Sequence, residues 1–394
     1  MAMNWDDIAR MVRKAPLPAK AAAAAVAGVL ALSGVIGAAL ALSPTPETPV
    51  PPSSPTSVAE DVATAAVGLD EAEAVQLEEQ AEPSSLPDAS VPDPLAVAAE
   101  ARSALNGASS TNELNLFDAS DGTSRVLGSD EAADVEAAIA AFADAGCSVG
   151  FVVYDLASQR GLGYNADGLY FCASTVKAPF ASYVLQDAVA SGAASLDDEV
   201  EEDLVMEGTG IMAEDDLTCY DLRTVLENTL VYSDNTGYAL LRERFEAAGF
   251  EAWCAQADVD AAAWLGEWYP SYTPRDLAKL WLNTGAFLMG DDPNAAWCRG
   301  LLERTHASFL REALGVDCTV LSKPGYEVDF PGYSTAALND AGLVVDDDGA
   351  YVVAIMSDAD YDDEYFTDNE HLIVDLAAAL DAARDRLLIE SEVA

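Results

Sequence analysis

Three short motifs contain residue types that can together transfer an acyl group through a serine hydroxyl. They are Ser174-Thr-Val-Lys177, Ser233-Asp-Asn235 and Lys323-Pro-Gly325, in this order along the chain. A serine hydroxyl is a weak nucleophile at neutral pH and needs an adjacent base. Ser174 and Lys177 are three residues apart, so on a helix their side chains share one face. We expect Ser174 to be a nucleophile and Lys177 its base, provided that the pKa of Lys177 is lowered from about 10.4.

The stretches around these motifs extend the pattern. Residues 149–167 read VGFVVYDLASQRGLGYNAD, residues 208–212 read GTGIM, and residues 273–278 read TPRDLA. Over about residues 129–390 the chain resembles the active-site serine penicillin-recognising enzymes, most of all the class A β-lactamases, and the penicillin-binding proteins. The resemblance implies a serine hydrolase of β-lactamase or DD-peptidase type that needs no cofactor.

The resemblance also implies a role for each side chain. Ser233 would pass a proton to the leaving nitrogen of the substrate. Asn235 would hydrogen-bond both Lys177 and the side-chain amide of the substrate. Lys323 would lower the pKa of Lys177, polarise Ser233 and attract the substrate carboxylate.

An oxyanion site is implied at the backbone N–H groups of Ser174 and Tyr326, with Gly325 beside them. Two such donors in a dry site stabilise a transition state by several kcal/mol. The expected substrate is a β-lactam or the acyl-D-Ala-D-Ala end of a peptidoglycan stem peptide. His306 and His371 are the only histidines, so we expect no metal site.

Two departures from the family pattern affect turnover and substrate choice. Pro324 stands where the family carries a threonine or serine hydroxyl that helps to bind the substrate carboxylate. Class A enzymes also carry an E-x-x-L-N stretch whose glutamate activates the deacylating water. Between residues 249 and 273 the only glutamates are Glu251 and Glu267, and neither has these neighbours. We expect efficient acylation and slow deacylation, because general-base help contributes about 10²–10⁴-fold.

Two other functions stay open at this point. A non-catalytic cell-wall-binding or scaffold protein with a degenerate β-lactamase fold would explain Pro324 and the missing glutamate motif. An esterase or amidase would share the mechanism and differ in its acyl substrate.

The charge of the chain restricts its partners. The net charge is −49, from 68 acidic and 19 basic residues. Such a surface repels phosphate backbones, so we expect no nucleic-acid partner.

An uncharged apolar stretch at residues 21–42 predicts a membrane anchor. At helical rise it spans roughly 33 Å, enough to cross the hydrocarbon core. Basic residues before it, Arg10, Arg13, Lys14 and Lys20, place residues 1–20 in the cytoplasm. We expect a single-pass protein of the cell membrane with an extracellular catalytic domain. The alternative is a cleaved signal peptide ending near Ala41.

The rest of the chain divides into a linker and one domain. Residues 43–128 are rich in proline, alanine and serine and in acidic residues, which predicts a disordered spacer. Residues 129–394 are expected to form the hydrolase domain. Its six cysteines permit up to three disulfides, although free thiols are equally consistent with the sequence. They are Cys147, Cys172, Cys219, Cys254, Cys298 and Cys318.

The residue pattern predicts an α+β fold of sandwich-like layers. Helices are expected at residues 129–145, capped by Ser129, and at 368–389. Strands are expected at residues 147–156, 162–165, 319–322, 335–345 and 351–356. A helical block fills residues 174–315. This order predicts a five-stranded antiparallel sheet flanked by helices, with an all-helical subdomain inserted between its second and third strands.

Overall fold

The structure is a computed structural model that describes residues 101–389, except residues 246, 263–265, 317, 329–333 and 362–368. The predicted cytoplasmic tail (1–20), the predicted anchor (21–42) and residues 43–100 of the predicted linker lie outside the described residues.

The predicted localisation, a single-pass cell-membrane protein with its catalytic domain outside the cell, is corrected here. Within the described part of residues 101–389, no helix is both long enough and apolar enough to cross a bilayer.

The main sheet is antiparallel and has eight strands among the described residues. Its order is β2-β1-β4-β3-β12-β11, and β9 and β10 pair with successive stretches of β11 at the far edge. The strands are β1 (Asn115–Asp118), β2 (Thr123–Val126), β3 (Val149–Asp155), β4 (Arg160–Tyr164), β9 (Thr319–Ser322), β10 (Gly325–Glu327), β11 (Ala337–Asp346) and β12 (Gly349–Ser357). The α+β prediction is confirmed, but the predicted count of five strands is too low. Strands β1 and β2 lie in the predicted linker, and the short β10 follows the proline of the third motif.

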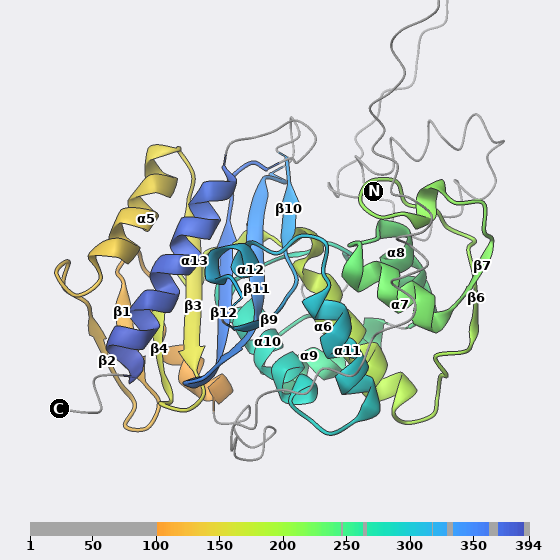
Figure 1. Ribbon diagram of the computed structural model, residues 1–394, viewed down its shortest axis with the longest axis horizontal. Helices are drawn as coiled ribbons and strands as arrows, with labels where there is room; N and C mark the ends of the chain where they lie inside the picture. The colour runs from red at the N-terminus through yellow and green to blue at the C-terminus, as the bar shows by residue number, and fades with distance from the viewer. Residues whose placement is uncertain are drawn as a thin grey trace, which may run out of the picture. The chain divides into compact units, whose positions relative to one another are not determined.

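Alternating side chains divide the core into two layers, one on each face of the sheet. Phe151 and Val153 of β3 pack on one face with α5 (Ala133–Asp144), α12 (Phe309–Leu314) and α13 (Glu370–Arg384). Val152 and Tyr154 pack on the other face with α10 (Pro274–Leu288) and the helices around it. Figure 1 shows α5 and α13 side by side over the sheet. The helical part lies beyond the edge of the sheet that β9 and β10 form.

The helical part contains most of the remaining elements. Its helices are α6 (Lys177–Tyr183), α7 (Leu222–Val231), α8 (Asn235–Arg244), α9 (Ala247–Gln256) and α11 (Pro293–Glu303), and its short turns of helix are η2 (Ala173–Val176), η3 (Val184–Val189) and η4 (Met212–Glu214). It is not all-helical as predicted. Two-stranded ribbons join β5 (Tyr170–Phe171) to β8 (Ser271–Tyr272) and β6 (Glu199–Glu201) to β7 (Cys219–Asp221).

Helix ends differ slightly from the predicted ones. The first helix begins at Ala133, and its N-cap residue is Ala132 rather than the predicted Ser129. The carboxylate of Glu131 instead accepts the backbone N–H of Gly128 at 2.9 Å and pairs with Arg125 at 2.8 Å. The last helix, α13, continues into the π-helical turn η5 (Asp385–Ile389), close to the predicted end.

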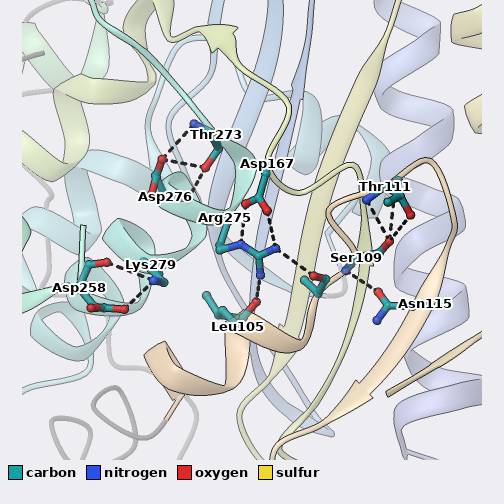
Figure 2. Close-up of polar contacts among 11 residues, drawn as sticks. Leu105, Ser109, Thr111, Asn115, Asp167, Asp258, Thr273, Arg275, Asp276 and Lys279 are labelled. Atoms are coloured by element: carbon teal, nitrogen blue, oxygen red, sulfur yellow. Dashed lines mark hydrogen bonds and ion pairs between the residues drawn. The ribbon is translucent and has the colours of Figure 1, made fainter. Parts of the chain in front are cut away.

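Residues 101–128 are part of the domain, so its predicted start at residue 129 is too late. They contain η1 (Leu105–Gly107) and the paired strands β1 and β2. Figure 2 shows that Arg275 at the start of α10 holds this segment. Its guanidinium pairs with Asp167 at 2.7 Å and donates to the carbonyl oxygens of Leu105 and Ala108. Composition averaged over residues 43–128 hides this short ordered part.

The six cysteines are free thiols in this structure. Three of them, Cys172, Cys254 and Cys298, are buried in the core layer that contains α10. Of the two alternatives left by the sequence, the structure therefore has the free thiols.

Candidate active site

Ser174 lies in η2, the turn of helix that leads into α6, and is partly exposed. Ala173 before it has φ +44°, a left-handed conformation that residues other than glycine rarely adopt. Asn339 on β11 donates its Nδ2–H to the carbonyl oxygen of Phe171 at 2.9 Å. Gly325 on β10 approaches so closely that an added Cβ would lie 2.7 Å from the backbone nitrogen of Ser174. Strands β10 and β11 therefore fix the position of this turn.

Lys177 is buried completely, and its amine contacts the second motif. Its Nζ donates to the carbonyl oxygen of Ser233 at 2.5 Å and to Oδ1 of Asn235 at 2.7 Å. Burial, followed by the charge of Lys323, lowers the pKa of Lys177 well below its usual range. A neutral amine has two N–H donors and one lone pair. Because two oxygens take the donors, the lone pair can accept a proton.

The hydroxyl of Ser233 lies between two amines. Lys323 Nζ is 3.0 Å from Ser233 Oγ, and Lys177 Nζ is 3.4 Å from the same atom. Ser233 has φ +55°, a left-handed conformation, and its carbonyl oxygen accepts a hydrogen bond from Lys177. Left-handed residues other than glycine cost about 1–3 kcal/mol and are concentrated at functional sites. Ser233 and Ala173 both fit that description.

Lys323 is buried and leaves β9 toward β10. Burial lowers the pKa of Lys323 to about 7, and the carboxylate of Asp340 opposes this effect. Asp340 on β11 is itself buried and accepts the backbone N–H of Leu310 at 3.0 Å. Burial raises the pKa of Asp340 to about 6. At neutral pH Lys323 is therefore only partly protonated.

The Ser233-Asp-Asn235 turn is held by the loop that precedes η4. The carboxylate of Asp234 accepts the backbone N–H of Ile211 at 2.6 Å. Gly210 has φ +117°, and a Cβ there would collide with this carboxylate. Thr209 donates its hydroxyl to the carbonyl oxygen of Ser233 at 2.9 Å. The carbonyl oxygen of Ser233 thus binds both a threonine and a lysine.

Tyr269 is a site residue that the sequence did not predict. Its hydroxyl donates to Oδ1 of Asn235 at 2.9 Å, and its ring centre is 5.8 Å from Lys177 Nζ. Burial raises the pKa of Tyr269 well above 10, so its hydroxyl stays protonated at neutral pH. Glu267, two residues earlier, is exposed, and Glu251 lies on α9.

Tyr326 borders the site with its backbone. Its ring packs against Phe309 and Tyr361, with centroids 5.9 and 4.9 Å away. Side chains alternate along a strand, and Gly325 faces the backbone of Ser174. The ring of Tyr326 is therefore on the side of β10 opposite to Ser174.

The structure brings together the side chains of Lys177, Ser233, Asn235 and Lys323, and it places Gly325 against Ser174. Ser174 Oγ forms no hydrogen bond with the part of the chain that the structure describes, Lys177 included. Catalytic hydrogen bonds are often long in unliganded enzymes.

Thr209 and Tyr269 complete the set of contacts. The GTGIM stretch gave a signal for Thr209, since it was part of the family resemblance. No local signal marks Tyr269, because its contact with Asn235 spans 34 residues of sequence.

A family model described as the β-lactamase enzyme family matches residues 132–383, which include all of these side chains. The chain belongs to this family. The predicted family resemblance is thereby confirmed. A comparison with curated proteins finds no match.

Several solved structures share the β-lactamase fold with this chain. PBP-A is 22% identical, with a TM-score of 0.53 over 65% of this chain and 97% of that chain. A β-lactamase from Sphaerobacter thermophilus is 23% identical, with a TM-score of 0.53 over 66% of this chain and 98% of that chain. A PBP-A variant solved as an acyl-enzyme complex with penicillin G is 22% identical, with a TM-score of 0.54 over 66% of this chain and 97% of that chain.

Proposed function

We propose that this β-lactamase family member is a serine acyl-transfer enzyme that forms an acyl-enzyme at Ser174. Its acyl donors are β-lactams or peptides of the D-Ala-D-Ala type. The observation that carries the proposal is the buried amine of Lys177, whose two donors are taken by Ser233 and Asn235. Burial lowers the pKa of this amine and so favours its neutral form, which can act as a base.

In the proposed acylation, Ser174 Oγ bonds to the carbonyl carbon of the substrate while its proton moves to Lys177 Nζ. The C–N bond then breaks, and Ser233 gives its proton to the leaving nitrogen. Ser233 regains a proton from Lys177, whose Nζ is 3.4 Å away. Backbone N–H groups of Ser174 and Tyr326 stabilise the oxyanion in this scheme.

We further propose that deacylation is slow. Hydrolysis of the acyl-enzyme needs a base beside the ester, and Tyr269 occupies the side of Asn235 next to Lys177. A phenol with a raised pKa is a poor base at neutral pH. The acyl-enzyme complex of the PBP-A variant with penicillin G is consistent with a long-lived intermediate on this fold.

The test is to incubate the full chain with penicillin G and follow intact mass over time. We expect one covalent addition per chain that persists, and no addition to the Ser174→Ala variant. Lys177→Ala should slow the addition by about 10²–10⁴-fold.

Rapid, catalytic penicillin hydrolysis would contradict slow deacylation. The absence of any adduct would contradict the acyl-transfer function and favour the wall-binding scaffold, a reading that Pro324 in the third motif supports.

A further inference from the structure

The amine of Lys323 is already bound to groups of the protein. It donates to Ser233 Oγ and to the carbonyl oxygen of Pro324, both at 3.0 Å. The residue is 1% exposed. At most one N–H remains for a substrate, and partial deprotonation reduces the positive charge behind it. A free carboxylate beside the scissile bond would therefore find a weak partner at Lys323.

The residues next to Lys323 in the sequence offer no other group that could bind a substrate carboxylate. Pro324 has neither a hydroxyl nor a backbone N–H. Between residues 319 and 346, the stretch that forms β9, β10 and β11, Lys323 is the only basic residue in the sequence. No second cation on these strands can bind a substrate carboxylate.

Glu327 adds a charge of the wrong sign. It lies two residues after Gly325 on β10, so both project to the same side of the strand, the side that faces Ser174. One carboxylate oxygen accepts the backbone N–H of Val328 at 3.0 Å, which holds the charge close to the strand. A substrate carboxylate next to β10 would be repelled by Glu327.

We infer that the acyl donors this enzyme prefers carry no free carboxylate on their leaving-group side. The substrate class is an amide or ester whose leaving side is uncharged, such as a peptide bond within a longer chain. A terminal D-Ala-D-Ala, whose leaving residue is an anion, is disfavoured within the proposed set of donors. This inference rests on the proposed acyl-transfer function at Ser174. The covalent step is the same: the Ser174 ester forms, the C–N bond of the amide or the C–O bond of the ester breaks, and a proton ends on the leaving nitrogen or oxygen.

The experiment compares penicillin G with its methyl ester, in which an uncharged ester group replaces that carboxylate. The second-order rate constant for covalent addition to the full chain is measured for each by intact mass. We expect the methyl ester to react at least as fast as the free acid, because Lys323 has at most one N–H for the carboxylate and Glu327 repels it. A faster reaction of the acid would overturn the inference and leave the proposed function standing. No addition of either compound would overturn both.

Two variants test the named residues. Pro324→Thr restores a hydroxyl, and Glu327→Gln removes the repelling charge. Each should raise the acid-to-ester rate ratio, by about threefold or more. Circular dichroism and thermal unfolding confirm that each variant is folded. An unchanged ratio in both folded variants would overturn the assignment of specificity to this strand.

Discussion

At the scale of single residues, the proposed acylation gives two lysines different tasks. In this scheme Lys177 must be neutral to accept the proton of Ser174, and burial lowers its pKa in that direction. A charged Lys323 helps, because a nearby cation disfavours protonation of Lys177 and strengthens the hydrogen bond to Ser233. The useful state is therefore Lys177 neutral and Lys323 protonated.

This pairing predicts a pH dependence for acylation. As pH rises through about 7, Lys323 loses its proton. The pKa of Lys177 then rises, and Ser233 loses its charged donor. We expect the acylation rate constant to fall on the alkaline side with an apparent pKa of about 7. Pre-steady-state labelling with penicillin G across pH measures it.

Lys323→Arg is the matched variant, since a guanidinium keeps its charge throughout this range. Its alkaline limb should move to a higher pH, even if the rate itself is lower. A wild-type rate that stays flat from about pH 6 to about pH 9 would contradict the assignment.

At the scale of elements, the site depends on the contact between β10 and η2. Gly325 leaves no room for a side chain: a Cβ would be 2.7 Å from Cys172 O and from the backbone nitrogens of Ser174 and Thr175. Real Cβ atoms do not approach backbone atoms so closely, so β10 or η2 would have to move. Either shift separates the backbone N–H groups of Ser174 and Tyr326.

Gly325→Ala should therefore slow acylation by penicillin G by about 10²-fold or more, the cost of losing one oxyanion donor. Thermal unfolding reports how much of the change is a loss of stability. Gly300→Ala in α11 is the control, because a Cβ there meets nothing within 4 Å. It should stabilise the helix by about 0.5–1 kcal/mol and leave acylation as in the wild type. Equal acylation rates for the two variants would contradict the proposed oxyanion site.

At the scale of the whole molecule, one buried cation connects the last helix to the sheet. Arg384 at the end of α13 is fully buried and pairs with Asp155 at 2.9 Å and with Asp346. Asp155 is the last residue of β3, and Asp346 is the last residue of β11. The guanidinium also lies 4.4 Å from the ring centre of Tyr351 on β12. The guanidinium of Arg384 therefore links α13 to the three strands β3, β11 and β12.

Arg384→Met should lower the free energy of unfolding by about 3–5 kcal/mol, because the buried Asp155 loses its counter-charge. Arg386→Ala is the control. Its pair with Asp134 is 3.7 Å long and exposed, and such pairs contribute about 0–1 kcal/mol. Denaturant unfolding of both variants measures the difference. Similar losses in the two variants would mean that the buried ion pair does not stabilise the domain.

The sequence by itself determined the family, the layered α+β fold and the identity of the motif residues. These features are local: alternation along a strand and residue types within four positions do not depend on distant packing. The strands predicted at residues 147–156 and 351–356 correspond to β3 and β12 for this reason. The same local reasoning failed for residues 101–128, whose order comes from pairing with β4 and from Arg275.

Only the tertiary structure decided how the motifs meet. Lys177 and Ser233 are 56 residues apart and Lys323 and Ser233 are 90 apart, yet both amines reach one hydroxyl. Their lowered pKa values follow from burial, which no motif encodes. The contact of Tyr269 with Asn235 arises in the same way, from the packing of distant segments. Such contacts depend on how the core packs distant segments together, whereas the chemical groups of each residue are determined by its type alone.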